Sequence, residues 1–187
     1  MRGTLLVLAL LATPALADEV AGVKVDDRVR VESSDLMLNG AGLRTKYFLN
    51  IYVAALYLTE KKATPADILA LRGAKRVSMR LMRGLSAKQL TDALEVGIDS
   101  NTSAPERETL KGRLDELTAI MNALQSAKKG DLIALDWLPG MGTRISLNGE
   151  PHGKPIAGED FYRALLRIWL GEEPAQESLK KALLGGS

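Results

Sequence analysis

The stretch that decides the fold is LNGAGLRTKYFLNIYVAALYL, residues 38–58, in which Arg44 precedes a strongly β-prone run. Residues 51–58 are rich in β-branched and aromatic side chains, which favour a strand. Asn39-Gly40 is a tight-turn signal ahead of this strand. The glycines at 40 and 42 give the backbone freedom without occupying space beside Arg44. The stretch therefore predicts sheet structure around a single arginine.

Two environments are open to Arg44 on physical grounds. Its guanidinium could point into an apolar layer, where it needs a partner because leaving it unpaired costs several kcal/mol. Alternatively, Arg44 lies at a strand edge and reaches water along its aliphatic stem. The residues themselves leave both open.

The N-terminus has the pattern of a secretory signal peptide over residues 1–17. Arg2 precedes an apolar run at residues 5–11, and Ala15-Leu16-Ala17 forms an Ala-x-Ala cleavage site before Asp18. The apolar run is well short of the ~20 residues that span a bilayer. We therefore expect export, with a mature chain that begins at Asp18 and contains no transmembrane segment.

Length and charge indicate one exported domain, residues 18–187. Arg2 is the one charged residue of 1–17, so 24 basic side chains remain against 23 acidic ones. This balance gives no electrostatic reason to expect nucleic acid as a partner. There is no cysteine, so disulfides, thiol nucleophiles and Cys-ligated metals are excluded.

Periodicity along the chain predicts an α+β domain. A five-member apolar stripe from Leu110 to Leu124 indicates a core-facing helix, introduced by the capping-box pattern Ser103-x-x-Glu106. Two hairpins within residues 132–156 indicate an antiparallel sheet. The expected strands are within 22–32, around Arg44, and at 75–83, 132–138, 143–147 and up to 156; the expected helices are 65–71, from 86, 104–128, 159–170 and 174–184.

Few residues could support catalysis. The glycines at 40 and 42 do not complete a dinucleotide motif, because Thr45 stands at its third position and no helix follows. His152 is the one histidine; we expect it in a turn between short strands, with no catalytic or metal-binding role. No Asp/Glu cluster has metal-ligand spacing, so neither a metal nor an organic cofactor is expected. The residues favour a binding protein over a hydrolase.

The segments at 38–44 and 51–58 resemble the chalcone isomerase-like family, in particular its exported bacterial branch, with its GxGxR motif and YVAALYL strand. The resemblance continues through residues 76–82, the helix from Ser86, the 131–147 hairpin and the segment from Phe161 to Gly171. It implies an antiparallel sheet covered on one face by a layer of helices, with a ligand cleft between them.

The resemblance also implies which residues form the site. In plant chalcone isomerases the arginine of this motif contacts the ligand's negative charge, and it corresponds to Arg44. The threonine of the next strand corresponds to Tyr52. The remaining polar residues of the plant site fall near four positions that do not match: Ser86, Gln89, Ala93 and Gly158. The pairing of Arg44 with Tyr52 resembles the fatty-acid-binding members of the fold.

Three functions follow as hypotheses. The first is non-catalytic, periplasmic binding of a small amphipathic acid, fatty-acid-like, through Arg44 and Tyr52. The others are an intramolecular lyase of the chalcone isomerase type and an envelope scaffold with a vestigial pocket. The polar residues of the plant site are not matched at Ser86, Gln89, Ala93 and Gly158, which argues against the lyase. We therefore expect no catalytic residue.

The pairing of Arg44 with Tyr52 carries a geometric condition. In one straight strand the two residues would share a face but lie roughly 26 Å apart, at about 3.3 Å per residue. They can share a ligand only if the strand folds back or bends near Tyr47-Phe48.

Overall fold

The computed structural model describes residues 18–186, and the expected signal peptide 1–17 lies outside them. Its centre is a seven-stranded antiparallel sheet with the strand order β11-β10-β9-β6-β5-β4-β3. Two small two-stranded sheets, β1-β2 and β7-β8, accompany it. The strands are β1 Asp18–Val20, β2 Val23–Val25, β3 Arg28–Val31, β4 Ser34–Lys46, β5 Leu49–Leu58, β6 Lys75–Leu81, β7 Leu85–Ser86, β8 Ser126–Ala127, β9 Leu132–Leu138, β10 Gly142–Leu147 and β11 Glu150–Ile156.

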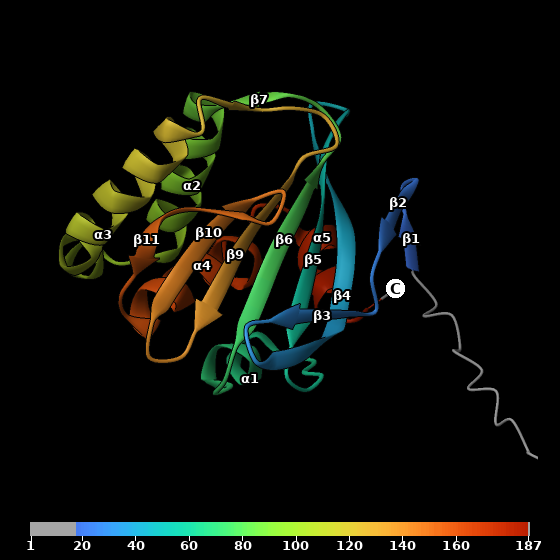
Figure 1. Cartoon of the computed structure of the whole chain (residues 1–187), viewed down its shortest axis with the longest axis horizontal. Helices are drawn as coiled ribbons and strands as arrows, with labels where there is room; N and C mark the ends of the chain where they lie inside the picture. Colours follow the sequence, from blue (N-terminus) through green and yellow to red (C-terminus); the bar gives the residue numbers. More distant parts are fainter. Residues whose placement is uncertain (1–17, 187) are drawn as a thin grey trace, which may run out of the picture.

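The helices lie on one side of this sheet, behind it in the view of Figure 1, with α2 and α3 stacked at its β11 end. They are α1 Pro65–Ala70, α2 Ala87–Asn101, α3 Ala104–Ala123, α4 Glu159–Leu170 and α5 Glu177–Leu183. The α+β class and the helical layer over one sheet face are confirmed. None of the helices in residues 18–186 is long and apolar enough to cross a bilayer.

Alternation along β5 divides the interior into two cores. Ala54, Leu56 and Leu58 face the helices, whereas Val53 and Tyr57 face β1–β3 on the opposite side. Because both faces of β5 are covered, the strand reads as a continuous apolar run without hydrophobic–polar alternation. The larger core lies between the sheet and the helices, and nearly all of α4 is buried in it.

Local sequence signals explain most of the helix boundaries. The Ser103 side chain accepts a hydrogen bond from the backbone N–H of Glu106 and caps α3, which is one half of the expected capping box; the Glu106 side chain pairs with Arg167 instead. The predicted helix 104–128 is too long, since α3 ends at Ala123. Residues 126–127 instead pair as β8 with β7, so the chain leaves the helix to form a strand. The final helix is also shorter than expected, at Glu177–Leu183.

Two turn predictions are wrong. Asn39-Gly40 lies inside β4, at a register shift between Leu38 and Gly40. The buried Asn39 side chain donates to Leu183 O (2.8 Å) and accepts from Lys62 N (2.7 Å). The Asn39 side chain therefore forms tertiary hydrogen bonds and does not form a turn. His152 lies within β11, where it pairs with Ile145, and not in a turn.

Glycine spacing in β4 lets α5 pack directly on the strand. Gly40 and Gly42 share the helix-facing side of β4, and a Cβ atom at Gly40 would clash with the backbone carbonyl groups of Ala182 and Leu183. A Cβ atom at Gly42 would lie 2.7 Å from Ala182 Cβ. The glycines are required here for space, since neither has a positive φ. Arg44 follows on the same face, two residues beyond Gly42.

We predict that Gly40→Ala lowers the free energy of unfolding by about 1–3 kcal/mol, because the added methyl group must push α5 away from β4. The matched control is Gly112→Ala on the exposed side of α3, where a Cβ atom meets nothing within 4 Å. That change should raise the free energy of unfolding by about 0.5–1 kcal/mol, because alanine favours a helix. Urea unfolding of both variants tests this, and equal stability of Gly40→Ala and the parent would contradict it.

Candidate ligand-binding site

The β4–β5 hairpin brings Arg44 and Tyr52 together. The chain folds back at Tyr47-Phe48, where Lys46 pairs with Leu49, and further along the two strands Arg44 pairs with Tyr52. Directly opposed residues of an antiparallel pair have Cβ atoms about 4.5–5.5 Å apart. The geometric condition on this pairing is therefore met by a turn between strands.

Tyr52 joins this site to the helical layer. Its ring packs against the larger core, and its hydroxyl accepts a hydrogen bond from Trp169 Nε1 of α4 at 3.0 Å. The ring is partly exposed, whereas the hydroxyl end is enclosed. This burial raises the pKa of Tyr52, and the Trp169 hydrogen bond and the Arg44 charge oppose the rise. Tyr52 is therefore a neutral phenol at physiological pH.

Arg44 is half-buried, and its hydrogen-bond acceptors within residues 18–186 are neutral. Its Nη1 donates to Thr45 O at 2.8 Å and to Gln176 Oε1 at 3.2 Å. Among residues 18–186, no carboxylate forms an ion pair with it. The guanidinium thus lies at the sheet–helix boundary with its charge uncompensated by a fixed anion.

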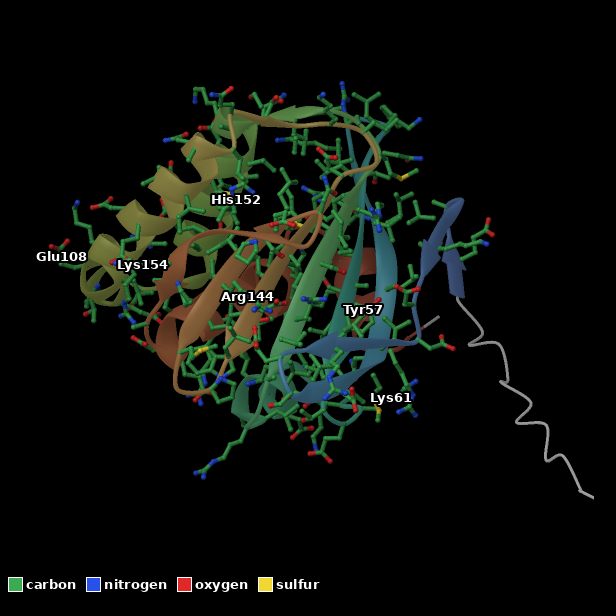
Figure 2. The ribbon with its side chains drawn as sticks, in the orientation of Figure 1. Tyr57, Lys61, Glu108, Arg144, His152 and Lys154 are labelled. Atoms are coloured by element: carbon green, nitrogen blue, oxygen red, sulfur yellow. The ribbon has the colours of Figure 1, made fainter. Side chains whose placement is uncertain are left out.

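Two other partly buried arginines of this chain, Arg76 and Arg144, are neutralised by carboxylates. Arg76 binds the fully buried Asp136 through two hydrogen bonds, Nε to Oδ1 at 2.6 Å and Nη2 to Oδ2 at 2.8 Å. Arg144 donates to the same Asp136 at 2.9 Å and also pairs with Glu32. Arg144 and Tyr57 mark this opposite face of the sheet, which is turned toward the viewer in Figure 2. The environment of Arg44 is chemically different from that of Arg76 and Arg144.

Gln176, directly before α5, is the site residue that the sequence did not reveal. Its Oε1 accepts from Thr45 N at 2.9 Å and from Thr45 Oγ1 at 3.4 Å, in addition to Arg44. Its Nε2 donates to Leu43 O at 3.3 Å and to Ser178 Oγ at 2.6 Å. One amide oxygen therefore occupies a point where a cation, a backbone N–H and a hydroxyl converge. No local motif marks it, because the contact joins β4 to a residue far along the chain.

Three of the four positions that replace the plant polar set, Ser86, Gln89 and Gly158, have structural roles. Ser86 and Gln89 form the capping box of α2, and Gln89 Oε1 accepts from Ser86 N at 2.9 Å. Ala93 is exposed on α2. Gly158 precedes α4 with a φ of 100°, and a Cβ there would clash with Arg113. None of these residues lies in contact with Arg44 through any hydrogen bond of the described chain.

A cavity of about 490 Å³ lies elsewhere, between α2 and α3. Leu94, Ile98 and Leu117 form part of its lining, with charged residues such as Arg107 around them. Neither Arg44 nor Tyr52 contributes to it. In residues 18–186 no group of three or more histidine, cysteine, aspartate or glutamate side chains is placed to hold a metal ion.

Comparison with known proteins identifies the family. The chain matches the chalcone isomerase-like family over residues 17–185, and it belongs to that family. A similar solved structure is that of a fatty-acid binding protein from Arabidopsis thaliana, with a TM-score of 0.68 and 16% sequence identity. The match covers 87% of this chain and 92% of the plant protein, which establishes the shared fold. No curated protein matches this chain in sequence.

We predict that Tyr52→Phe lowers the free energy of unfolding by about 1–2 kcal/mol, because Trp169 Nε1 loses its acceptor in a buried position. Tyr57→Phe is the matched control: this tyrosine is buried on the other face, and its hydroxyl forms no hydrogen bond with the described residues. Guanidinium unfolding followed by tryptophan fluorescence measures both. A loss of stability that is the same in the two variants would contradict a specific Tyr52–Trp169 contribution.

Proposed function

We propose that this protein binds a small amphipathic carboxylic acid of the fatty-acid type without transforming it. The observation that carries the proposal is the half-buried Arg44 guanidinium, whose acceptors in the described chain are the amide oxygen of Gln176 and the carbonyl of Thr45. A carboxylate is a stronger acceptor than either, because the hydrogen bonds to it are charge-assisted. The similarity to a fatty-acid binding protein of the same fold supports this class of ligand.

The ligand carboxylate would replace the Gln176 amide oxygen. At that point Arg44 Nη1, Thr45 N and Thr45 Oγ1 already converge on one oxygen. A carboxylate there accepts the same donors and also compensates the cation, and its second oxygen can take a further N–H of the planar guanidinium. In this proposal the Gln176 amide occupies the site in the absence of ligand, and a carboxylate displaces it because the carboxylate is the stronger acceptor.

Tyr52 and the surrounding apolar residues would bind the remainder of the ligand. The phenol is neutral and close to Arg44, so it can donate one hydrogen bond to the carboxylate while Trp169 donates to it. The aliphatic chain gains about 0.8 kcal/mol for each methylene buried. It would lie along the helix-facing side of β4, where Leu179 of α5 now packs against Gly42. Binding therefore requires α5 to shift away from the strand.

The residues do not favour isomerase chemistry. Ser86 and Gln89 are used in a helix cap, and Ala93 and Gly158 carry no acid or base. The one anchoring cation and the one phenol are sufficient for binding an acid. The signal-peptide pattern at residues 1–17 supports export, and the resemblance of residues 38–58 to the exported bacterial branch leads us to propose the periplasm of a Gram-negative bacterium as the destination.

The Arg44 anchor is tested with laurate and dodecanol, which differ in the carboxylate. The parent should bind laurate, and Arg44→Ala should weaken that binding about tenfold to a hundredfold without changing the affinity for dodecanol. Arg44→Lys should restore binding only in part, because an ammonium lacks the planar fork. Isothermal titration calorimetry gives the affinities, and thermal melts should show that Arg44→Ala is no less stable than the parent.

The matched control is Arg80→Ala. Arg80 is also partly buried, and its side-chain hydrogen bond within residues 18–186 is to a carbonyl, Gly130 O at 2.9 Å, but it lies on the opposite face of the sheet. This variant should bind laurate like the parent. A destabilised Arg44→Ala protein with no laurate binding in either Arg44→Ala or the parent would contradict the proposal and favour a scaffold with a vestigial pocket.

Gln176→Glu should create a permanent internal anion for Arg44. We expect laurate binding weakened about tenfold through competition. The melting temperature should change little, because the new ion pair is offset by the loss of the Nε2 hydrogen bonds to Leu43 O and Ser178 Oγ. Gln176→Ala should remove the competitor and bind laurate at least as tightly as the parent. Unchanged laurate affinity in Gln176→Glu would show that the acid does not bind at this oxygen position.

A further inference from the structure

The tip of the β4–β5 hairpin carries a cluster of exposed apolar side chains. Tyr47 is 83% exposed, Phe48 is fully exposed and Leu49 is 49% exposed, and the three are consecutive. They account for three of the five exposed large hydrophobic residues in the described chain, the others being the isolated Val96 and Met141. The hairpin projects at the top of the sheet in Figure 1, beside the chain segment that contains β7. We call residues 47–49 the aromatic tip.

The backbone of this tip is unfavourable for its own residues. Tyr47 and Phe48 have φ values of 49° and 64°, in the left-handed region that bulky side chains rarely adopt. The β10–β11 hairpin has the same two-residue connection, with Leu147 paired to Glu150, and there the turn is Asn148-Gly149 with φ of 53° and 87°. Asn-Gly is the preferred sequence for such a turn. Folding alone therefore gives no reason for aromatic residues at the first hairpin.

Basic side chains lie at the same end of the sheet as the aromatic tip. Lys46 adjoins it, with its Nζ 5.7 Å from the centre of the Tyr47 ring. Met82 N donates to Ile51 O (2.9 Å) and Gly130 N donates to Leu81 O (2.7 Å), so two further segments lie at the same end of the sheet. These segments present the exposed Arg83, Lys128 and Lys129, while Asp131 is bound by Lys128 N and Asn148.

We propose that the aromatic tip is a docking site for an anionic lipid bilayer. Tyrosine and other aromatic side chains favour the interface between headgroups and acyl chains, where the ring is buried and a polar group stays hydrated. Lysine and arginine beside them attract anionic headgroups. The exposed turn gains from transfer of its apolar side chains out of water, which a hydrophilic Asn-Gly turn cannot provide. A lipid surface explains both the aromatic composition and the basic rim.

This docking would place the candidate acid site close to the membrane surface. Arg44 lies three residues before the tip on β4, a distance of about 10 Å at 3.3 Å per residue. An amphipathic acid could therefore pass between the bilayer and Arg44 over a short path. The docking itself does not depend on acid binding, so it can be tested with vesicles that contain no free fatty acid.

The test uses the chain from Asp18 onward, which contains the whole described fold and lacks the apolar N-terminal segment. Co-sedimentation is measured with vesicles of phosphatidylcholine alone and with vesicles that also contain phosphatidylglycerol. We expect binding to the anionic vesicles, weakened at high salt. Phe48→Ser and the double variant Tyr47→Asn/Phe48→Gly should each reduce it at least about tenfold. The double variant should also melt no lower than the parent, because it installs the preferred turn residues.

Control variants separate docking through the aromatic tip from nonspecific adsorption to vesicles. Met141→Ser removes an exposed apolar side chain at another hairpin and should leave vesicle binding unchanged. Lys128→Gln/Lys129→Gln should weaken binding to anionic vesicles alone. In Phe48→Trp, the new indole fluorescence should shift to shorter wavelength with anionic vesicles, whereas in Met141→Trp it should not. Equal vesicle binding by Phe48→Ser and the parent would overturn the proposal. Absence of vesicle binding, together with sedimentation velocity data showing that the tip mediates self-association, would also overturn it.

Discussion

The packing of α5 against the glycine-lined face of β4 is the contact on which the candidate site depends. Two glycines at alternate positions leave no side chain between strand and helix, so the helix backbone lies against the strand. Asn39 strengthens this contact through its hydrogen bond to Leu183 O. As a result, Gln176 at the start of the helix meets Arg44 further along the same strand face. The spacing of Gly40, Gly42 and Arg44 therefore has a structural reason: the two glycines let α5 approach β4, and this approach brings Gln176 into contact with Arg44.

The electrostatic state of Arg44 follows from this arrangement. A partly buried guanidinium is usually paired, because an uncompensated charge away from water is costly. On the other side of the sheet Arg76 and Arg144 follow that rule, because Asp136 binds both of them. Beside α5 the chain supplies an amide where a carboxylate would fit. An amide satisfies hydrogen bonding without cancelling the charge, so Arg44 keeps the uncompensated positive charge on which our proposal of anion binding rests.

The sequence predicted the class of fold for identifiable reasons, and it singled out Arg44 as a candidate ligand-binding residue. The apolar run of β5, the stripe of α3 and the two hairpins after residue 131 each follow one clear periodicity. The hairpin that joins Arg44 to Tyr52 could not be predicted with the same certainty, because its turn is Tyr47-Phe48 and lacks turn-forming residues. The turn predicted at Asn39-Gly40 was wrong because these residues, although typical of turns, lie inside β4. The asparagine and the glycine serve contacts with α5, which local patterns do not reveal. Gln176 was not predicted, because only the tertiary structure brings it to β4.

The central claim is that a ligand carboxylate replaces the Gln176 amide on Arg44, and a crystal structure of the chain with bound laurate tests it most directly. The account predicts carboxylate oxygens within hydrogen-bonding distance of the Arg44 guanidinium and Thr45 N, Gln176 displaced, and α5 moved away from Gly42. The contrary result would be laurate bound elsewhere, such as in the cavity between α2 and α3, with the hydrogen bond from Arg44 to Gln176 intact.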